Sequence, residues 1–140
     1  VISLELAKKM ADACEVKKAT KDWNPINIAI VDAGADLILF RRQDNAFLGS
    51  IDIAIKKAIS SAMIPRSTRK VGELAYSENG DLGPRPGVAT VDFLVPFAGG
   101  LPIRTDKGDL LGAIGVSGAS SDQDEECAQA AIDAVRDLLK

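Results

Sequence analysis

Two apolar segments joined by a short polar turn constrain the fold of this 140-residue chain more than any other feature. The segments are INIAIV, residues Ile26 to Val31, and LILFRR, residues Leu37 to Arg42, with DAGAD between them. Apolar and β-branched runs around an Asp/Gly turn predict a β-hairpin, which is an antiparallel pair of strands. The unbroken apolarity of the first run indicates a strand covered on both faces, and therefore a central one.

Three further segments have strand character, namely Val91–Phe97, Gly99–Thr105 and Leu110–Gly118. The DKGD sequence at residues 106–109 supplies the turn of a second hairpin. Such short turns leave no room for the crossover helices that a parallel, Rossmann-type sheet requires. The predicted fold class is therefore α+β, with an antiparallel sheet of about five strands flanked by helices.

Helical periodicity accounts for most of the remaining chain. A first helix is expected from the N-cap Ser3 to a point before Asp22, with one apolar face formed by Ala7, Met10, Ala11 and Cys14. A short helix is expected at Thr68–Ala75, before a Gly/Pro loop at 83–87 that is either functional or a surface excursion. A closing helix is expected from about Asp122 to Leu139, with an inner face of Ala131, Ala134, Val135 and Leu138.

The remaining helix is predicted from Ser50, as its N-cap, to about Ile64. Its apolar stripe consists of Ile51, Ala54, Ile55, Ala58, Ile59 and Ala62. Ile53 and Ile64 form a smaller second stripe on the side that carries Lys57 and Ser60. A second stripe indicates that a neighbouring subunit or a ligand covers that side.

Two cysteines, Cys14 and Cys127, fall within predicted helices beside small apolar residues. Two cysteines do not make a disulfide framework, so we expect two buried free thiols. The alternative is a redox pair, which requires the two helices to touch.

The composition excludes several classes of function. The chain has no histidine, which rules out Ser-His-Asp and Cys-His catalysis, zinc sites built on histidine and a proximal-histidine haem site. With a net charge of −3 and dispersed basic residues, the chain is not expected to bind nucleic acid. No apolar run approaches the ~20 residues of a membrane helix.

We expect the chain to form one domain, residues 1–140. We expect this domain to be cytoplasmic, with secretion as the alternative because the chain begins at Val1 without Met.

The glycine-punctuated segment Leu110–Ala128 resembles neither a phosphate loop nor a nucleophile turn on closer inspection. No lysine follows its glycines, and the GVSGA sequence lacks the final glycine of a nucleophile elbow. Asp124 and its acidic neighbours are expected to complement a helix N-terminus rather than to bind a metal, and Ser120 and Gln123 fit a capping box. The glycines, together with the Gly99–Gly100 pair, indicate close approach of either a helix or a planar ligand.

Four segments together resemble the GlcG/HbpS-like family, which includes the C-terminal domain of PduO-type proteins. They are IAIVDAGADLILFRRQDNA, SIDIAIKKA, FAGGLPI and LLGAIGVSGASSDQDEECAQAAI. The resemblance implies a profilin-like α+β domain, assembly as a homo-oligomer, and an accessory role that involves binding of haem or a corrinoid-related ligand. Haem would have to bind through Thr, Tyr, Met, Cys or Lys, or without strong ligation, and Gln43 stands where family members often carry Met. The candidate ligand-binding positions are Asp32, Arg42, Asp44, Lys57, Gly99, Gly100, Pro102 and Asp124.

Three functions are compatible with these observations. The first is a small-molecule or tetrapyrrole-binding module in which Arg42 and Lys57 meet ligand carboxylates. The second is an enzyme for a small organic acid, with Asp32, Asp44 or Asp124 as the base. The third is a structural oligomer that binds a protein partner.

Overall fold

A four-stranded antiparallel sheet forms the centre of the protein, as a computed structural model of residues 1–140 shows. The strands are β1 (Asn27–Asp32), β2 (Leu37–Arg42), β3 (Gly100–Arg104) and β4 (Leu110–Ser117), in the spatial order β2-β1-β4-β3. Both predicted hairpins are confirmed, because β1 pairs with β2 and β3 pairs with β4. The fold is therefore α+β, as expected.

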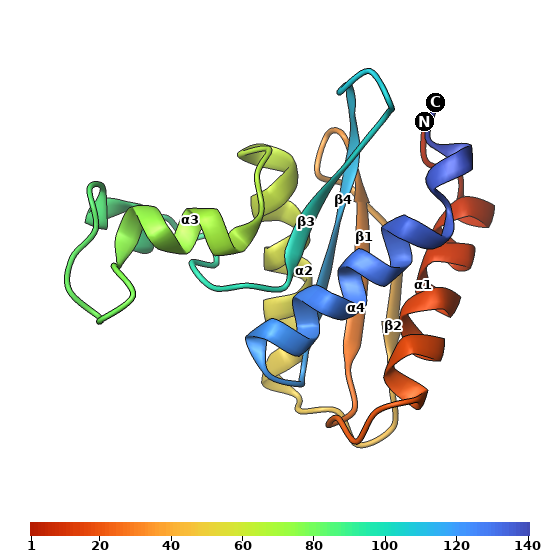
Figure 1. Cartoon of the computed structure of the whole chain (residues 1–140), viewed down its shortest axis with the longest axis horizontal. Coiled ribbons are helices and arrows are strands. Elements are labelled where there is room, and N and C mark those ends of the chain that lie inside the picture. Colours follow the sequence, from red (N-terminus) through yellow and green to blue (C-terminus); the bar gives the residue numbers. More distant parts are fainter.

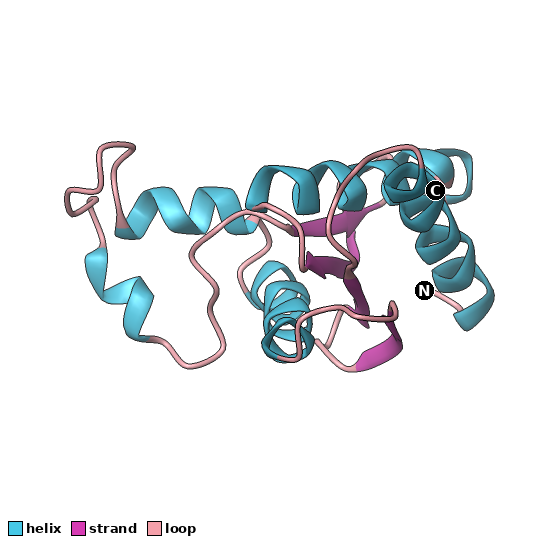
Figure 2. Cartoon of the chain, turned by 90° about the horizontal axis from the view of Figure 1, so that it is seen from below, coloured by secondary structure: helices cyan, strands magenta, loops and turns pink.

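The central position of β1 follows from its sequence, since all of its apolar residues are buried. Alternate side chains enter two separate clusters: Ile28 and Ile30 join the larger core, while Ala29 and Val31 join a smaller one on the opposite face. Helices α1 (Leu4–Ala19) and α4 (Ser121–Ala134) cover the first face, and α2 (Gly49–Met63) covers the second. Figure 2 shows this arrangement, with the sheet between the two helical layers.

The expected fifth strand at Val91–Phe97 is wrong. A 3₁₀ helix at Pro86–Thr90 precedes this segment, and the Leu94 N–H donates to the Val91 carbonyl in a turn. The segment then attaches to α2, because Ser60 Oγ donates to Phe93 O and accepts from Val95 N. Backbone groups that a strand would pair with a neighbour are thus satisfied by one side chain.

Helix α2 also differs from the prediction at its start and in its orientation. It begins at Gly49, with Leu48 at the N-cap position, so Ser50 lies inside the helix and does not cap it. The face against the sheet carries mainly small or polar residues, namely Ser50, Ala54, Lys57, Ala58, Ser61 and Ala62. The predicted stripe isoleucines at 51, 55 and 59 are only half-buried at the sides. Small residues face the sheet because the helix lies very close to it.

The closing helix is shorter than predicted. Helix α4 ends at Ala134, and a 3₁₀ turn follows at Arg136–Leu138. Of the predicted inner face, Ala131 and Val135 are buried as expected, whereas Ala134 and Leu138 are exposed, because the tighter winding turns Leu139 into the core instead.

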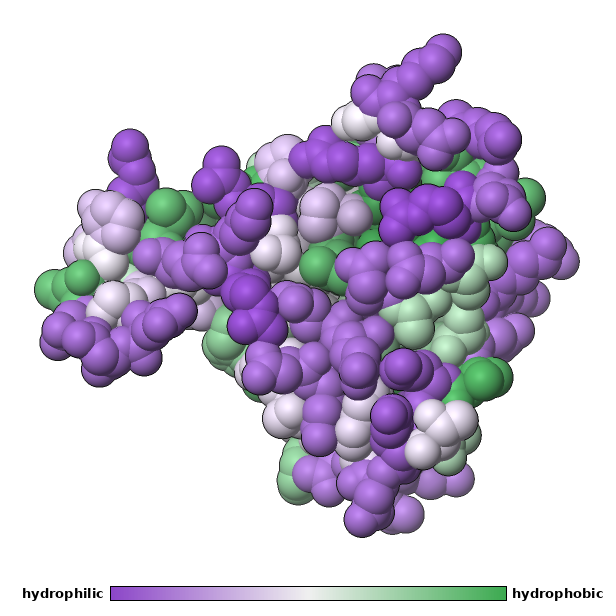
Figure 3. Space-filling model, in the orientation of Figure 1, coloured by the Kyte–Doolittle hydropathy of each residue, from purple (hydrophilic) through white to green (hydrophobic).

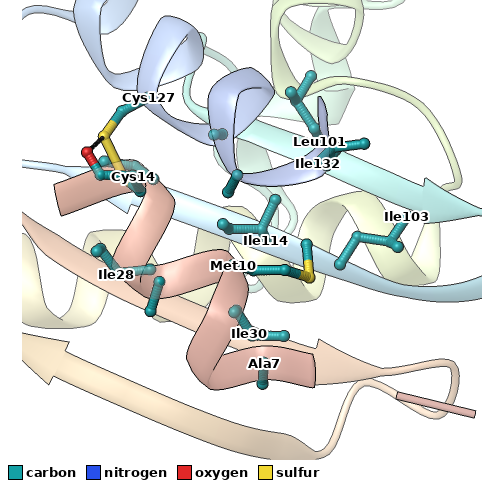
Figure 4. Packing of buried hydrophobic residues seen from close by; sticks show 14 of the residues in the cluster. Ala7, Met10, Cys14, Ile28, Ile30, Leu101, Ile103, Ile114, Cys127 and Ile132 are labelled. Atoms are coloured by element: carbon teal, nitrogen blue, oxygen red, sulfur yellow. Dashed lines mark hydrogen bonds between the residues drawn. A yellow bond between two sulfur atoms is a disulfide. The ribbon is translucent and has the colours of Figure 1, made fainter. Parts of the chain in front are cut away.

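Helices α1 and α4 lie side by side on the larger core, and a disulfide joins Cys14 to Cys127 (Figure 4). The expectation of two free thiols is therefore wrong. Both cysteines lie on the buried faces of their helices, with a Cα–Cα distance of 4.8 Å. That distance lies within the range that a disulfide requires.

We expect the double substitution Cys14→Ala/Cys127→Ala to lower the free energy of unfolding by at least ~2 kcal/mol, because the disulfide closes a long loop in the unfolded chain. Urea unfolding with and without dithiothreitol measures the effect. The reductant should destabilise the wild type and leave the double variant unchanged. Equal stability of the oxidised and reduced wild type would contradict the prediction.

The segment between α2 and β3 projects from the body of the molecule (Figure 1). It contains helix α3 (Thr68–Ala75), found at the predicted residues, and the 3₁₀ helix. Its exposed hydrophobic side chains include Tyr76, Leu82 and Val91. No helix of the protein is both long and apolar enough to cross a membrane.

Candidate functional site

A hollow of about 530 Å³ opens at the end of the sheet where β1 begins and β4 ends. Four parts of the chain line it: the loop before β1, the start of α2, the residue Phe97 before β3, and the junction of β4 with α4. These segments meet because antiparallel pairing places Asn27 opposite Ser117. The hollow therefore lies where the chain enters β1, and where it leaves β4 and begins α4.

A buried ion pair forms one wall of this hollow. Lys57 Nζ of α2 lies 3.2 Å from Asp124 Oδ2 of α4, and the two side chains are only 1% and 3% exposed. Lys57 also donates to the Val116 carbonyl at 2.9 Å, and its ammonium lies 5.0 Å from the centre of the Phe97 ring. The pair connects helices on opposite faces of the sheet, around the end of β4.

Asp124 is held in place by the start of its own helix. Its Oδ1 accepts from the Ala119 N–H at 3.0 Å, and the predicted capping box is present in the contacts between Ser120 and Gln123. The prediction that the acidic residues complement this helix N-terminus fits both Asp122 and Asp124, which lie in its first turn, and Asp124 in addition points inward to Lys57. The carboxylate is thus fixed by the helix cap and neutralised by Lys57.

Gly99 explains how a lysine fits into this space. A Cβ at residue 99 would lie 2.5 Å from Lys57 Nζ and 2.6 Å from the Val116 carbonyl, and φ is +137°. Only glycine tolerates both the backbone conformation and the contact. Gly100 has a related role, because its N–H donates to Thr68 Oγ1 and a Cβ there would meet the Lys57 carbonyl.

Burial shifts the pKa of both partners. It raises the pKa of the Asp124 carboxyl above 3.8, although the nearby Lys57 ammonium and the backbone N–H of Ala119 oppose the shift. Burial likewise lowers the pKa of the Lys57 ammonium below 10.5, against the attraction of Asp124. In both groups the loss of water outweighs the partner's charge.

These shifts predict a pH dependence with a defined sign. Just above pH 3.8 the folded protein binds more protons at Asp124 than the unfolded chain, so this contribution to stability falls as the pH rises. Just below pH 10.5 the folded protein binds fewer protons at Lys57, so its contribution rises with pH. NMR titration of the ¹³Cγ of Asp124 and the ¹⁵Nζ of Lys57 measures the two pKa values in the folded protein, and the urea-unfolded chain gives the reference values. A native Asp124 that titrates below 3.8 would contradict the assignment.

Aromatic side chains form the other walls of the hollow. Trp23, Phe47 and Phe97 all line it, from three separate segments. The whole chain has six aromatic residues, so half of them gather at this one place. The lining also includes the hydroxyl groups of Ser50, Ser117, Ser120 and Ser121. The lining is thus mainly polar, since four of its fourteen residues are hydrophobic, and three of those four are aromatic.

The predicted site residues divide among several places. Lys57 and Asp124 meet in the hollow, with Gly99 and Gly100 packed against Lys57. Asp32 is at the opposite end of β1, where its Oδ1 accepts from the N–H groups of Gly34 and Asp36 in the hairpin turn. The remaining three lie elsewhere, Arg42 and Asp44 in a shallow depression beside α1 and Pro102 on the edge strand β3.

Sequence reasoning missed the three aromatic residues of the site. They lie in loops without periodicity, so their convergence depends on the tertiary fold. One signal was available in the scarcity of aromatic residues, which make up 4% of the chain. The short FAGG and NAFLG segments each place a phenylalanine beside glycine or alanine.

Comparison with known families gives one match over nearly the whole chain. Residues 2–133 match the family described as "Haem degrading protein HbpS-like". A protein described as an uncharacterized 15.0 kDa protein from Citrobacter freundii is 34% identical over 137 residues, which cover 98% of this chain and 94% of that protein.

Solved structures of similar fold include two whose descriptions bear on function. The haem complex of PduOC has a TM-score of 0.83 and 27% identity, covering 96% of this chain and 94% of that one. A double mutant of HbpS from Streptomyces reticuli has a TM-score of 0.81 and 32% identity, covering 95% and 86%.

Proposed function

The chain belongs to the HbpS-like family, and from this premise we propose that it binds a planar, tetrapyrrole-like small molecule such as haem in the hollow beside Lys57 and Asp124. One observation carries the proposal: Trp23, Phe47 and Phe97 converge on that hollow from separate segments. In this proposal, the rings stack on the flat faces of a macrocycle. The haem complex of the similar PduOC structure supports the choice of ligand.

The residues present fit the macrocycle better than they fit its iron. The chain has no histidine, and the Lys57 ammonium is occupied by Asp124 and the Val116 carbonyl. The remaining side-chain oxygens in the lining belong to serine hydroxyl groups, Asp22, Asn24 and Gln123, which are weak ligands for haem iron compared with histidine. We therefore propose binding through stacking and hydrogen bonds, without a strong protein ligand to the iron.

Trp23 makes the proposal directly testable, because it is the only tryptophan of the chain and it lines the hollow. Titration with haemin should quench the tryptophan fluorescence to saturation at a one-to-one ratio. The Soret band should change at the same haemin concentrations. Phe97→Ala is expected to weaken binding ~5- to 10-fold, because one stacking contact contributes about 1 kcal/mol.

Phe93→Ala is the matched control, since Phe93 lies on the same loop but outside the hollow. It should leave the affinity for haemin unchanged. Haemin that fails to quench Trp23, or that binds equally well to Phe97→Ala, would contradict the proposed site. Iron-free protoporphyrin should bind within a few-fold of haemin, since the proposal gives the iron no strong ligand.

The domain organisation and the oligomeric state are further proposals that rest on membership of the family. We propose that the chain is a single profilin-like domain that assembles into a homo-oligomer. The projecting segment supports assembly, because Tyr76, Leu82 and Val91 expose hydrophobic surface there. Ile53 and Ile64, the second stripe of α2, are half-buried within one chain. Sedimentation of the wild type and of Leu82→Ser tests assembly through this segment.

A further inference from the structure

A second and larger hollow, of about 700 Å³, lies between the start of α3, strand β3 and the end of α4. Two of its twelve lining residues are hydrophobic, and it shares no residue with the hollow beside Trp23. Figure 3, in the orientation of Figure 1, shows a predominantly hydrophilic surface on this side of the molecule. An apolar macrocycle has little to contact there.

Positive charge is concentrated in this second hollow. Its lining includes the four cations Arg66, Lys70, Arg104 and Arg136, against the single carboxylate of Asp106. The net charge of the lining is thus +3 in a chain whose total is −3, so all other residues together carry −6. Like charges gathered against the overall balance of a protein attract an anion.

Most of these cations have no carboxylate partner. Arg136 pairs with Asp133 at 2.8 Å, whereas Arg66, Lys70 and Arg104 form no salt bridge. Outside this hollow, Arg41 and Arg69 pair with carboxylates, and Arg42 and Arg85 form no salt bridge. The second hollow is distinguished by gathering three cations without a carboxylate partner in one lining.

Arg104 is held in a fixed position without losing its charge. Its guanidinium donates to the Gly108 carbonyl at 3.0 Å and to the Pro65 carbonyl at 2.6 Å. The Pro65 contact also ties the β3–β4 hairpin to the segment that carries Arg66 and Lys70. Neutral acceptors orient the group, and its positive charge remains available to a ligand.

We propose that this hollow is a binding site for a small polyanion, a molecule that carries a phosphate group or several carboxylates. Arg66, Lys70 and Arg104 supply the charge, and Ser67 and Gln129 in the lining can supply neutral hydrogen bonds. Pro102 lies in the same lining, which gives this candidate residue a place in a second site. The site is independent of the hollow proposed for the tetrapyrrole.

Pyrophosphate and citrate are the two probes, titrated separately by isothermal calorimetry at constant ionic strength. We expect one or both to bind saturably and to shift the NMR signals of the Gln129 side-chain amide. The double variant Arg66→Gln/Lys70→Gln should weaken binding at least ~10-fold, because each lost cation removes a charge-assisted contact. The tighter probe identifies the anionic group that the site prefers.

Lys8→Gln/Lys9→Gln is the matched control, since it removes two exposed positive charges from α1 on another part of the surface. It should leave the affinity unchanged. The proposal is overturned by no saturable binding of either probe at millimolar concentration, or by an equal loss in both double variants. A probe that alters Trp23 fluorescence would place the anion in the other hollow and overturn it as well. Haemin titration of Arg66→Gln/Lys70→Gln should match the wild type, which separates the two sites.

Discussion

Lys57→Met is expected to lower the free energy of unfolding by about 3–5 kcal/mol, the usual cost of removing one partner of a buried ion pair. The methionine fills most of the volume, but it leaves the Asp124 carboxylate at 3% exposure without its cation. The Val116 carbonyl loses a donor at the same time. Urea unfolding followed by circular dichroism measures the effect at neutral pH.

Two variants separate the charge effect from a packing effect. Lys57→Met/Asp124→Leu should recover most of the lost stability, because no unpaired charge remains buried. Lys56→Met is the neighbouring control; its exposed pair with Asp52 should make the change smaller than ~1 kcal/mol. A double variant as unstable as Lys57→Met alone would show that the pair itself is not the cause.

Gly115→Ala is expected to cost about 3 kcal/mol, because the added methyl group has no space. A Cβ at residue 115 would lie 2.2 Å from the Ala54 carbonyl, 2.6 Å from Ala58 N and 2.9 Å from Lys57 Cβ. Two of these atoms belong to the backbone of α2, so the whole helix must move away from the sheet. Thermal unfolding should show a markedly lower Tm.

Gly87→Ala provides the comparison for this substitution, since a Cβ there meets no atom within 4 Å. Its effect on the unfolding free energy should stay within ~0.5 kcal/mol. If Gly115→Ala were equally mild, α2 would not lie as close to β4 as the structure indicates. The same displacement should also weaken haemin binding, because α2 carries Lys57 into the site.

The sequence allowed the secondary structure to be predicted well where the signal was local. The two hairpins, the N-cap at Ser3 and the capping box at Ser120 all depend on residues within a few positions of one another. Local signals also failed at the start of α2, where Ser50 does not cap the helix, but the larger errors arose where tertiary contacts decide. Val91–Phe97 has the composition of a strand, but Ser60 of α2 satisfies its backbone instead.

The candidate site illustrates the same limit. Lys57 and Asp124 were both singled out, yet their pairing joins residues 67 positions apart, and no local pattern indicates it. The Gly115 contact explains why: α2 lies close to the sheet with its small residues inward, which carries Lys57 into the interior. A lysine beside isoleucines on a helix ordinarily reaches solvent.

The link between Cys14 and Cys127 also determines how the molecule responds to tension. A force applied at the two ends would pass from α1 to α4 through the sulfur–sulfur bond, and the 112 residues between the cysteines would carry no load. Only 13 residues at each end could be drawn out. At about 3.5 Å per residue, the chain would extend by ~90 Å rather than the ~490 Å of the reduced form. In the oxidised protein the sheet and the hollow beside Trp23 are mechanically shielded, whereas the second hollow would lose Gln129, Ile132 and Arg136 as the C-terminal residues are drawn out.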